Sequence, residues 1–374
     1  MPDDITQAVL ARDDVVRYLQ GGHGQTPRQA RERIDAYLDE LRTTQRYPFY
    51  RALKHPLYPI LRKIERKFEH VDIVREATAR GRVIYASNHK SHIDYLVEPL
   101  VLDDNGIRPP VIAAGINLFG GPLGLLHRHV TGAIPIRRDT KDPAYFVTLK
   151  AYLAEVLRRH DLLFYPEGGR SYSGELKQAK TGLVQAAMQA DCPGLAIVPT
   201  AIAYDLVLED RILARQGVKR RQRPFARELA EMVSQAVGYR SRAIVTFGTP
   251  IDMAEYDPQA RHDVLALAHR TRQDIGRLYK VLPTAVVAAA MRPSVATRVL
   301  EWRIEAVLGK LQAAGANLET IDVQETMDRG VELLEARAVL VVERGRFRVR
   351  DRMVLRYYAR TINHLLQPPP ARSH

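Results

Sequence analysis

The chain has 374 residues and a formal net charge of +13, and 46% of its residues are hydrophobic. That length and apolar content predict one large domain with appendages, or two domains, built around a sizeable core. A single cysteine, Cys192, excludes a disulfide framework and a cysteine zinc site, and it indicates a reducing compartment or a fold that does not depend on disulfides. The pI of about 9.8 favours an anionic partner, but basicity alone does not distinguish phosphorylated substrates, anionic lipid surfaces and nucleic acids.

The N-terminal part of the chain, residues 1–70, predicts polar-amphipathic helices. It starts with the acidic and polar sequence MPDDITQAVLARDD, which is not typical of a secretory signal. The chain contains no uninterrupted apolar run of about 18 residues, so we expect no membrane-spanning helix. Residues 46–68 mix aromatic and aliphatic residues with Arg and Lys, which suits a membrane-surface segment. Packing of this segment against the core explains the same composition equally well.

From residue 81 the pattern alternates between strands and helices. Short apolar runs predict strands at 83–87, 111–114, 133–136, 162–165, 196–199 and 243–247. Longer periodic segments predict helices at 91–102, 142–159 and 181–190. This alternation predicts an α/β fold, a mixed central sheet flanked by helices, with N-terminal helical and C-terminal mostly helical extensions. We place the three regions at 1–74, 75–255 and 256–374.

Three further parts of the sequence can be interpreted: a glycine-rich segment, a basic stretch and the C-terminal region. The glycine-rich apolar segment 115–129 fits an acyl-chain groove or a buried loop. The basic stretch 208–240 is typical of a solvated face. Residues 257–279 and 295–314 look helical, and 338–349 predicts a hairpin around a glycine before a last helix at 350–366 and a disordered tail. Such helices with a hairpin fit a winged-helix-like module.

The sequence VIYASNHKSHIDYLVE, residues 83–98, is the richest in chemistry. A buried strand ends before His89, and Ser91 with Asp94 predicts a capping box that starts a helix. A histidine at a strand end can take a proton from an alcohol, and a carboxylate on its other nitrogen would stabilise the imidazolium. The structural alternative is a helix-capping Asp94 beside a hydrogen-bonded loop histidine. His92 is interpreted as structural, since it lies only two residues before Asp94.

Three other groups of residues follow predicted strands. The strand GAIPI ends in Arg137-Arg138, which can grip phosphate or lie free on the surface. The strand before FYPEGGRS runs into a glycine turn that holds a carboxylate and an arginine, which fits an anion-binding nest or a tight turn with an internal ion pair. Lys177 and Lys180 precede a helix whose predicted cap is Thr181, and IVPTAIAY alone indicates only core.

Taken in order, these four groups resemble the four motifs of the glycerolipid acyltransferases: NHKSHIDYL, GAIPIRRD, FYPEGGRS and IVPTAIAY. The segment PPVIAAGINL is also similar to the bacterial membrane-associated glycerol-3-phosphate acyltransferase and its relative, dihydroxyacetone-phosphate acyltransferase. The resemblance covers about residues 75–255 and continues weakly through YKVLPTAVVAA and VLRYYARTINHLL. One departure is Pro135, where the bacterial enzymes usually carry an aromatic residue.

The resemblance implies a role for each matching residue. His89 would be the general base and Asp94 its orienting carboxylate, with Glu167 implicated in catalysis. The positions that would bind the acceptor or shape its site are Arg138, Gly168, Arg170, Ser171 and Pro199, and we add Lys180 as a third cationic contact.

These observations together predict a glycerol-3-phosphate 1-O-acyltransferase that uses acyl-CoA or acyl-carrier protein at an anionic membrane surface. A thioester is already activated, so we expect no metal and no cofactor. We expect attachment at the cytoplasmic face, peripheral or monotopic. The alternatives are a dihydroxyacetone-phosphate or lysophosphatidate acyltransferase and, outside the enzymes, a nucleic-acid-binding protein that uses residues 210–223 and the hairpin; we expect no nucleic-acid partner.

Overall fold

The computed structural model describes residues 4–21, 25–46, 64–119, 131–137, 140–219 and 240–367. Its centre is an eight-stranded sheet with the order β1-β7-β6-β2-β5-β3-β4, and β8 pairs with the outer part of β6. The strands are β1 (Ile64–Glu69), β2 (Val83–Ser87), β3 (Val111–Gly115), β4 (Ala133–Ile136), β5 (Leu162–Phe164), β6 (Ala196–Tyr204), β7 (Ser241–Phe247) and β8 (Ile251–Asp252). The sheet is mixed, because β6 runs antiparallel to β7 and β8 while the other neighbours are parallel. The predicted fold class is confirmed.

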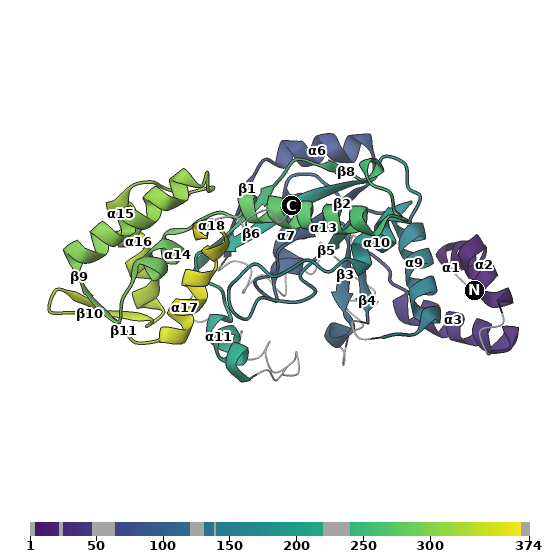
Figure 1. The fold of residues 1–374 in the computed structure, drawn as a ribbon, viewed down its shortest axis with the longest axis horizontal. Coiled ribbons are helices and arrows are strands. Elements are labelled where there is room, and N and C mark those ends of the chain that lie inside the picture. Colours follow the sequence, from purple (N-terminus) through teal and green to yellow (C-terminus); the bar gives the residue numbers. More distant parts are fainter. Residues whose placement is uncertain are drawn as a thin grey trace.

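Helices cover both faces of this sheet (Figure 1). Strand β2 shows why: Val83 and Tyr85 belong to the core that includes α6 and α7, while Ile84 and Ala86 belong to the core that includes α9 and α10. Both faces are apolar, as expected for a parallel strand buried on two sides. The helices of this part are α6 (Val71–Arg80), α7 (Asp94–Asp104), α9 (Pro143–Leu157), α10 (Gly182–Met188), α11 (Asp210–Lys219) and α13 (Arg261–Leu278), with 3₁₀ turns at Ile116–Phe119 and Met253–Glu255.

The described residues of the N-terminal extension include the helices α1 (Asp4–Leu10), α2 (Asp13–Gln20) and α3 (Pro27–Leu41), which lie at one end of the molecule (Figure 1). Residues 47–63 of the predicted surface segment 46–68 lie outside the described residues, and its C-terminal end is described. There, Ile64–Glu69 is strand β1, which pairs in parallel with β7 at the sheet edge. Half of this strand's charged side chains face solvent, as an edge strand allows. Its sequence therefore lacks the apolar run of a core strand and looks like that of a polar helix.

The C-terminal extension lies at the opposite end of the molecule (Figure 1). It contains α14 (Pro283–Ala290), α15 (Thr297–Ala313), α16 (Val323–Ala336), α17 (Arg352–Arg360) and α18 (Asn363–Leu366). A three-stranded antiparallel sheet in the order β10-β11-β9 joins them: β9 (Ser294–Ala296), β10 (Leu340–Glu343) and β11 (Arg346–Val349). The structure therefore has the predicted hairpin. None of the described helices combines the length and apolarity needed to cross a membrane.

Candidate active site

The structure brings His89 and Asp94 together where β2 ends and α7 begins. The two atoms joined are the imidazole Nδ1 and the carboxylate Oδ2, which lie 2.9 Å apart. Strand β2 ends at Ser87, so the short loop before α7 carries His89 at the carboxyl end of the sheet. A carboxylate on Nδ1 fixes the imidazole tautomer in which Nδ1 carries the hydrogen and Nε2 can accept a proton.

The Asp94 carboxylate is fully buried and accepts several hydrogen bonds. Oδ2 also accepts from the amides of Lys90 (2.7 Å) and Ser91 (2.9 Å), and Oδ1 accepts from the Tyr204 hydroxyl (2.7 Å). Burial raises the pKa of Asp94 to about 6, while these hydrogen bonds act in the opposite direction. Asp94 is therefore ionised at neutral pH and holds a negative charge against the imidazole.

The local helix start differs from the prediction. Helix α7 begins at Asp94 with Ile93 as its N-cap, and the cap side chain makes no hydrogen bond. Ser91 is not the N-cap residue: its hydroxyl donates to the buried carboxylate of Glu209 (2.8 Å) and accepts from the Ile93 amide (3.3 Å), before the helix begins. Half of the predicted capping box is present, since Asp94 accepts from the Ser91 amide. Asp94 therefore both fastens this loop and contacts His89, so the two roles considered for it are not exclusive.

The loop after β5 holds the main chain of His89 from two sides. Glu167 accepts the His89 amide through Oε1 (3.1 Å) and the Lys177 amide through Oε2 (3.1 Å). The Ser171 amide donates to the His89 carbonyl (3.0 Å), and the Ser171 hydroxyl donates to the Glu175 carbonyl (2.6 Å). Glu167 is buried, and burial raises its carboxyl pKa. The structure thus places Glu167 and Ser171 as supports of the His89 backbone.

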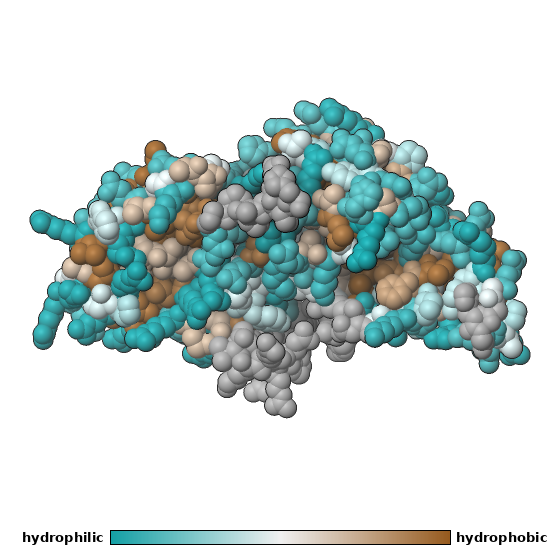
Figure 2. All heavy atoms as spheres, in the orientation of Figure 1, coloured by the Kyte–Doolittle hydropathy of each residue, from teal (hydrophilic) through white to brown (hydrophobic). Residues whose placement is uncertain are grey.

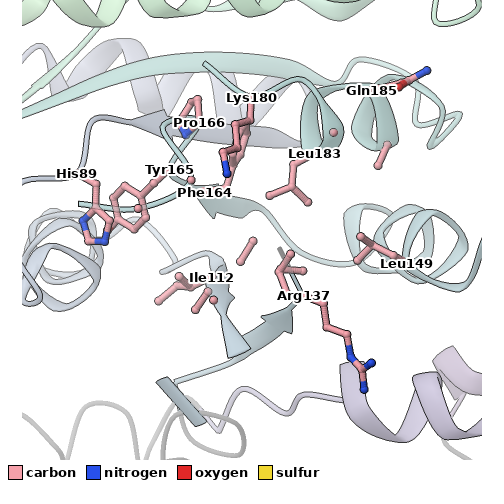
Figure 3. Close-up of a pocket in the computed structure, with 18 of the residues that line it drawn as sticks. His89, Ile112, Arg137, Leu149, Phe164, Tyr165, Pro166, Lys180, Leu183 and Gln185 are labelled. Atoms are coloured by element: carbon pink, nitrogen blue, oxygen red, sulfur yellow. The ribbon is translucent and has the colours of Figure 1, made fainter. Parts of the chain in front are cut away.

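Gly168 and Lys180 lie together at the edge of the site. Gly168 has φ +68°, and a Cβ built there would meet the Lys180 side chain at 2.8 Å. The Lys180 amide donates to the Pro166 carbonyl (2.8 Å), which brings the start of α10 against the turn. Figure 3 shows the Lys180 side chain directed toward the pocket between His89 and Leu183. Within the described part of the chain its amino group has no ion-pair partner.

Arg170 is buried, with 7% of its surface exposed. Its Nη1 lies 3.4 Å from Glu209 Oε1, and its guanidinium lies over the Tyr172 ring. Glu209 also accepts from the His92 amide (2.6 Å), so it connects the two motif loops. Arg170 is not among the residues that line the described pocket. Its role in phosphate binding stays a prediction.

Pro199 and the arginine pair occupy different places in the sheet. Pro199 lies in β6 opposite Ala86 of β2, and its carbonyl accepts from Gly248 (2.8 Å). Arg138 lies outside the described residues. Its neighbour Arg137 is described and makes two hydrogen bonds to Glu40 of α3, at 2.7 and 2.5 Å.

A pocket of about 320 Å³ extends from His89 into the space beside α9 and α10 (Figure 3). Figure 2 shows apolar side chains gathered at the surface near α9 and β4. Cationic side chains of Lys150, Lys180 and Arg137 lie at its margin. The apolar part of the lining includes Ile112, Ile136, Phe146, Leu149, Phe164 and Leu183. Residues 115–129, the predicted groove, contribute Gly115 to this lining, and residues 120–129 lie outside the described part.

Several residues of the site were missed from the sequence. Three of them contact the loop that carries His89 from distant positions in the sequence: Tyr165, Tyr204 and Glu209. Short-range residue spacing does not predict such contacts. Glu98 did leave a signal, because it is a carboxylate inside the otherwise apolar segment YLVEPLVL of α7. The described residues contain no group of His, Cys, Asp and Glu side chains arranged to hold a metal ion.

Comparisons with known proteins identify a family model and several relatives that are similar to this chain. Residues 57–203 match the family model described as Acyltransferase. The chain is 33% identical over 244 residues to a glycerol-3-phosphate acyltransferase of Actinobacillus succinogenes, a match that covers 63% of this chain and 30% of that protein. It is 30% identical over 295 residues to the enzyme of the same name from Pseudomonas syringae pv. syringae, covering 71% of this chain and 35% of that protein.

One solved structure, the 1-acyl-sn-glycerophosphate (LPA) acyltransferase of Thermotoga maritima, aligns with a TM-score of 0.34 and 12% identity, over 57% of this chain and 71% of that one. The chain spans about a third of the length of the two curated relatives described above.

Proposed function

Because this chain belongs to the acyltransferase family, with glycerol-3-phosphate acyltransferases among its relatives, we propose that it is a glycerol-3-phosphate 1-O-acyltransferase. The donor would be acyl-CoA or acyl-carrier protein, and the reaction would be the first step of phospholipid synthesis. The observation that carries the proposal is the His89 Nδ1–Asp94 Oδ2 contact of 2.9 Å beside an apolar pocket.

The chemistry follows from the two ends of the imidazole. Nε2 of His89 takes the proton from the acceptor hydroxyl as its oxygen attacks the thioester carbonyl. The tetrahedral intermediate then collapses, the carbon–sulfur bond breaks, and the proton passes from His89 to the leaving thiolate. Asp94 stabilises the imidazolium that exists between these steps, because its buried, negatively charged carboxylate lies 2.9 Å from Nδ1. The proton removed from the acceptor hydroxyl leaves with the thiol, so the reaction is balanced and needs no further reactant.

The pocket supports a fatty acyl donor. Its walls are largely aliphatic and aromatic, and it begins at His89, so a chain lying in it would place its thioester carbonyl beside the base. The cationic margin suits the negative charges of an acyl-CoA, of an acyl-carrier protein or of the acceptor phosphate. Among these cations Lys180 is the first candidate for the phosphate, because it lines the pocket beside Gly168 and has no ion-pair partner within the described residues. Arg138 and Arg170 are the other two proposed contacts.

Replacing these cations should separate the two substrates. Lys180→Ala, Arg138→Ala and Arg170→Ala are expected to raise the KM for glycerol-3-phosphate by more than they raise the KM for the acyl donor. A lost charge-assisted hydrogen bond costs roughly 1.5–3 kcal/mol. Steady-state kinetics with each substrate varied in turn make the measurement.

Arg137→Ala is the matched control and should have a smaller effect, because Arg137 is held by Glu40. Equal increases in both KM values would identify the three cations as structural. Arg170→Ala also leaves Glu209 buried without its cation, so its melting temperature must be compared with that of the other variants.

The acceptor is decided by an activity panel. The purified chain should be offered glycerol-3-phosphate, dihydroxyacetone phosphate and lysophosphatidate, each with a long-chain acyl-CoA and with an acyl-carrier protein. We expect glycerol-3-phosphate to give the highest kcat/KM, because lysophosphatidate would need a second apolar groove beside that of the donor. A preference for lysophosphatidate of about tenfold, worth about 1.4 kcal/mol in the transition state, would overturn this choice and leave the His89 chemistry in place.

We further propose attachment at the cytoplasmic face of a membrane, peripheral or monotopic. The support is the net charge of +13 and the mixed apolar and basic composition near residues 46–68. Vesicles containing anionic lipid should carry more of the chain in flotation than neutral vesicles, and salt should weaken the binding. If equal amounts of the chain float with anionic and with neutral vesicles, electrostatic attraction does not contribute to membrane attachment.

A further inference from the structure

Two carboxyl groups lie buried one turn apart on α7, Asp94 and Glu98. Their partners differ. Asp94 accepts from backbone amides and contacts His89, as described above. Glu98 is 2% exposed, and its two oxygens make hydrogen bonds with hydroxyl groups, Oε2 with Tyr165 at 2.8 Å and Oε1 with Ser87. Glu98 therefore has neutral partners and makes none of the contacts with His89.

Tyr165 connects Glu98 to the base. It follows β5, and its ring stacks on the imidazole of His89 with centroids 4.1 Å apart and an angle of 13° between the planes. Figure 3 shows the two rings side by side at the edge of the pocket. Asp94 holds the imidazole by one edge and Tyr165 holds it by one face, so two different elements fix the direction of Nε2. The hydroxyl bond to Glu98 in turn fixes the Tyr165 ring.

We propose that Tyr165 is a positioning residue for the acyl-transfer step and that Glu98 holds it in place as a neutral, protonated acid. This inference rests on the proposed function. The stacked ring would do more than orient the base, because the face of an aromatic ring attracts a cation and His89 becomes an imidazolium after it takes the proton. Tyr165 would thus stabilise the intermediate state as well as aim the ring.

The neutrality of Glu98 follows from its position. Two ionised carboxylates this close in a buried site repel each other, so one of them stays protonated. Asp94 has the N–H donors that favour a charge, and Glu98 does not. Burial and the nearby Asp94 raise the pKa of Glu98 well above its ordinary value. A protonated carboxyl has one donor and one acceptor, which is the same pattern that a glutamine amide offers to Ser87 and Tyr165.

Three variants, a control and one reserve variant test the inference through kcat at saturating substrates. Tyr165→Leu removes the stacked ring and is expected to lower kcat by about tenfold, with KM changed by less than about twofold. Tyr165→Phe keeps the ring and should stay within about threefold of the wild type, and Glu98→Gln should do the same. Tyr85→Phe is the control, because Tyr85 is a buried tyrosine of β2 whose hydroxyl has no partner among the described residues. Tyr165→Met provides a second variant without the ring if the leucine variant fails to fold.

A spectroscopic measurement makes the result independent of turnover. With histidine labelled by ¹³C, the ring signal of His89 is identified by its absence in His89→Gln. The Tyr165 ring current should displace this signal in the wild type and in Tyr165→Phe, and the displacement should vanish in Tyr165→Leu.

Three outcomes would overturn the inference. They are an unchanged His89 signal in Tyr165→Leu, an unchanged kcat in that variant, and a loss of activity in Glu98→Gln as large as that in Asp94→Asn. Inactivity of the wild type with every donor and acceptor would overturn the proposed function, and with it the catalytic role of Tyr165. The ring-current measurement would still decide whether Tyr165 holds His89.

Discussion

Replacement of His89 by alanine is expected to lower kcat for acyl transfer by about 10²–10⁴-fold while leaving the fold intact. The loss is large because the acceptor alcohol is a poor nucleophile until its proton is removed. The fold should persist because the hydrogen bonds from His89 to Glu167 and Ser171 involve its main chain and remain in the alanine variant. Steady-state kinetics and thermal melting of the same preparation make the measurement.

His92→Ala is the matched control for this experiment. His92 lies in the same loop and also lines the pocket, and its amide donates to Glu209. We expect its kcat to fall much less than that of His89→Ala. Binding of the phosphorylated acceptor should be nearly unchanged in His89→Ala, since the proposed phosphate contacts are separate residues. A variant lacking the His89 imidazole with near-normal kcat would exclude His89 as the general base.

The strands and the central pair of residues could be predicted because their signals are local. The run VIYA with polar residues after it placed β2 at 83–87, as observed. The five-residue spacing from His89 to Asp94 crosses a single loop, so strand and helix together bring the side chains within 2.9 Å. Strand β1 was missed because its charged edge-strand sequence lacks an apolar run. Helices α14 and α16 were not predicted either, although the hairpin between β10 and β11 was.

The contacts that complete the site depend on residues far apart in the sequence. Glu209 reaches Ser91 across 118 positions and Tyr204 reaches Asp94 across 110. No spacing rule finds such pairs, because the sheet order and the loop paths decide them. The same reason explains Arg170, whose motif position suggests a substrate contact and whose observed partner is a buried carboxylate.

The surroundings of Asp94 predict how it should respond to substitution. Asp94→Asn keeps the size of the side chain and an oxygen that can accept from the amides of Lys90 and Ser91, while the Tyr204 hydroxyl can turn to accept from the new amide. The loss of stability should therefore stay within about 1 kcal/mol. The negative charge opposite the imidazolium is lost altogether, and we expect kcat to fall by roughly 10³–10⁴-fold. Retained activity with lowered stability would instead show that Asp94 only fastens the loop.

The pH dependence of stability gives an independent check on Asp94. Its folded-state pKa of about 6 lies above the ordinary value of 3.8, so the folded protein binds this proton more tightly than the unfolded chain. The cost of burying the charge is present in full above pH 6 and disappears as the pH falls toward 4. Asparagine carries no such cost at any pH.

The melting temperature of Asp94→Asn relative to the wild type should therefore be highest near pH 7 and should fall as the buffer is taken from pH 7 to pH 5. If the difference in melting temperature between the variant and the wild type does not change over this range, Asp94 titrates as an ordinary carboxyl. In that case its burial beside His89 does not disfavour the negative charge that the proposed mechanism needs.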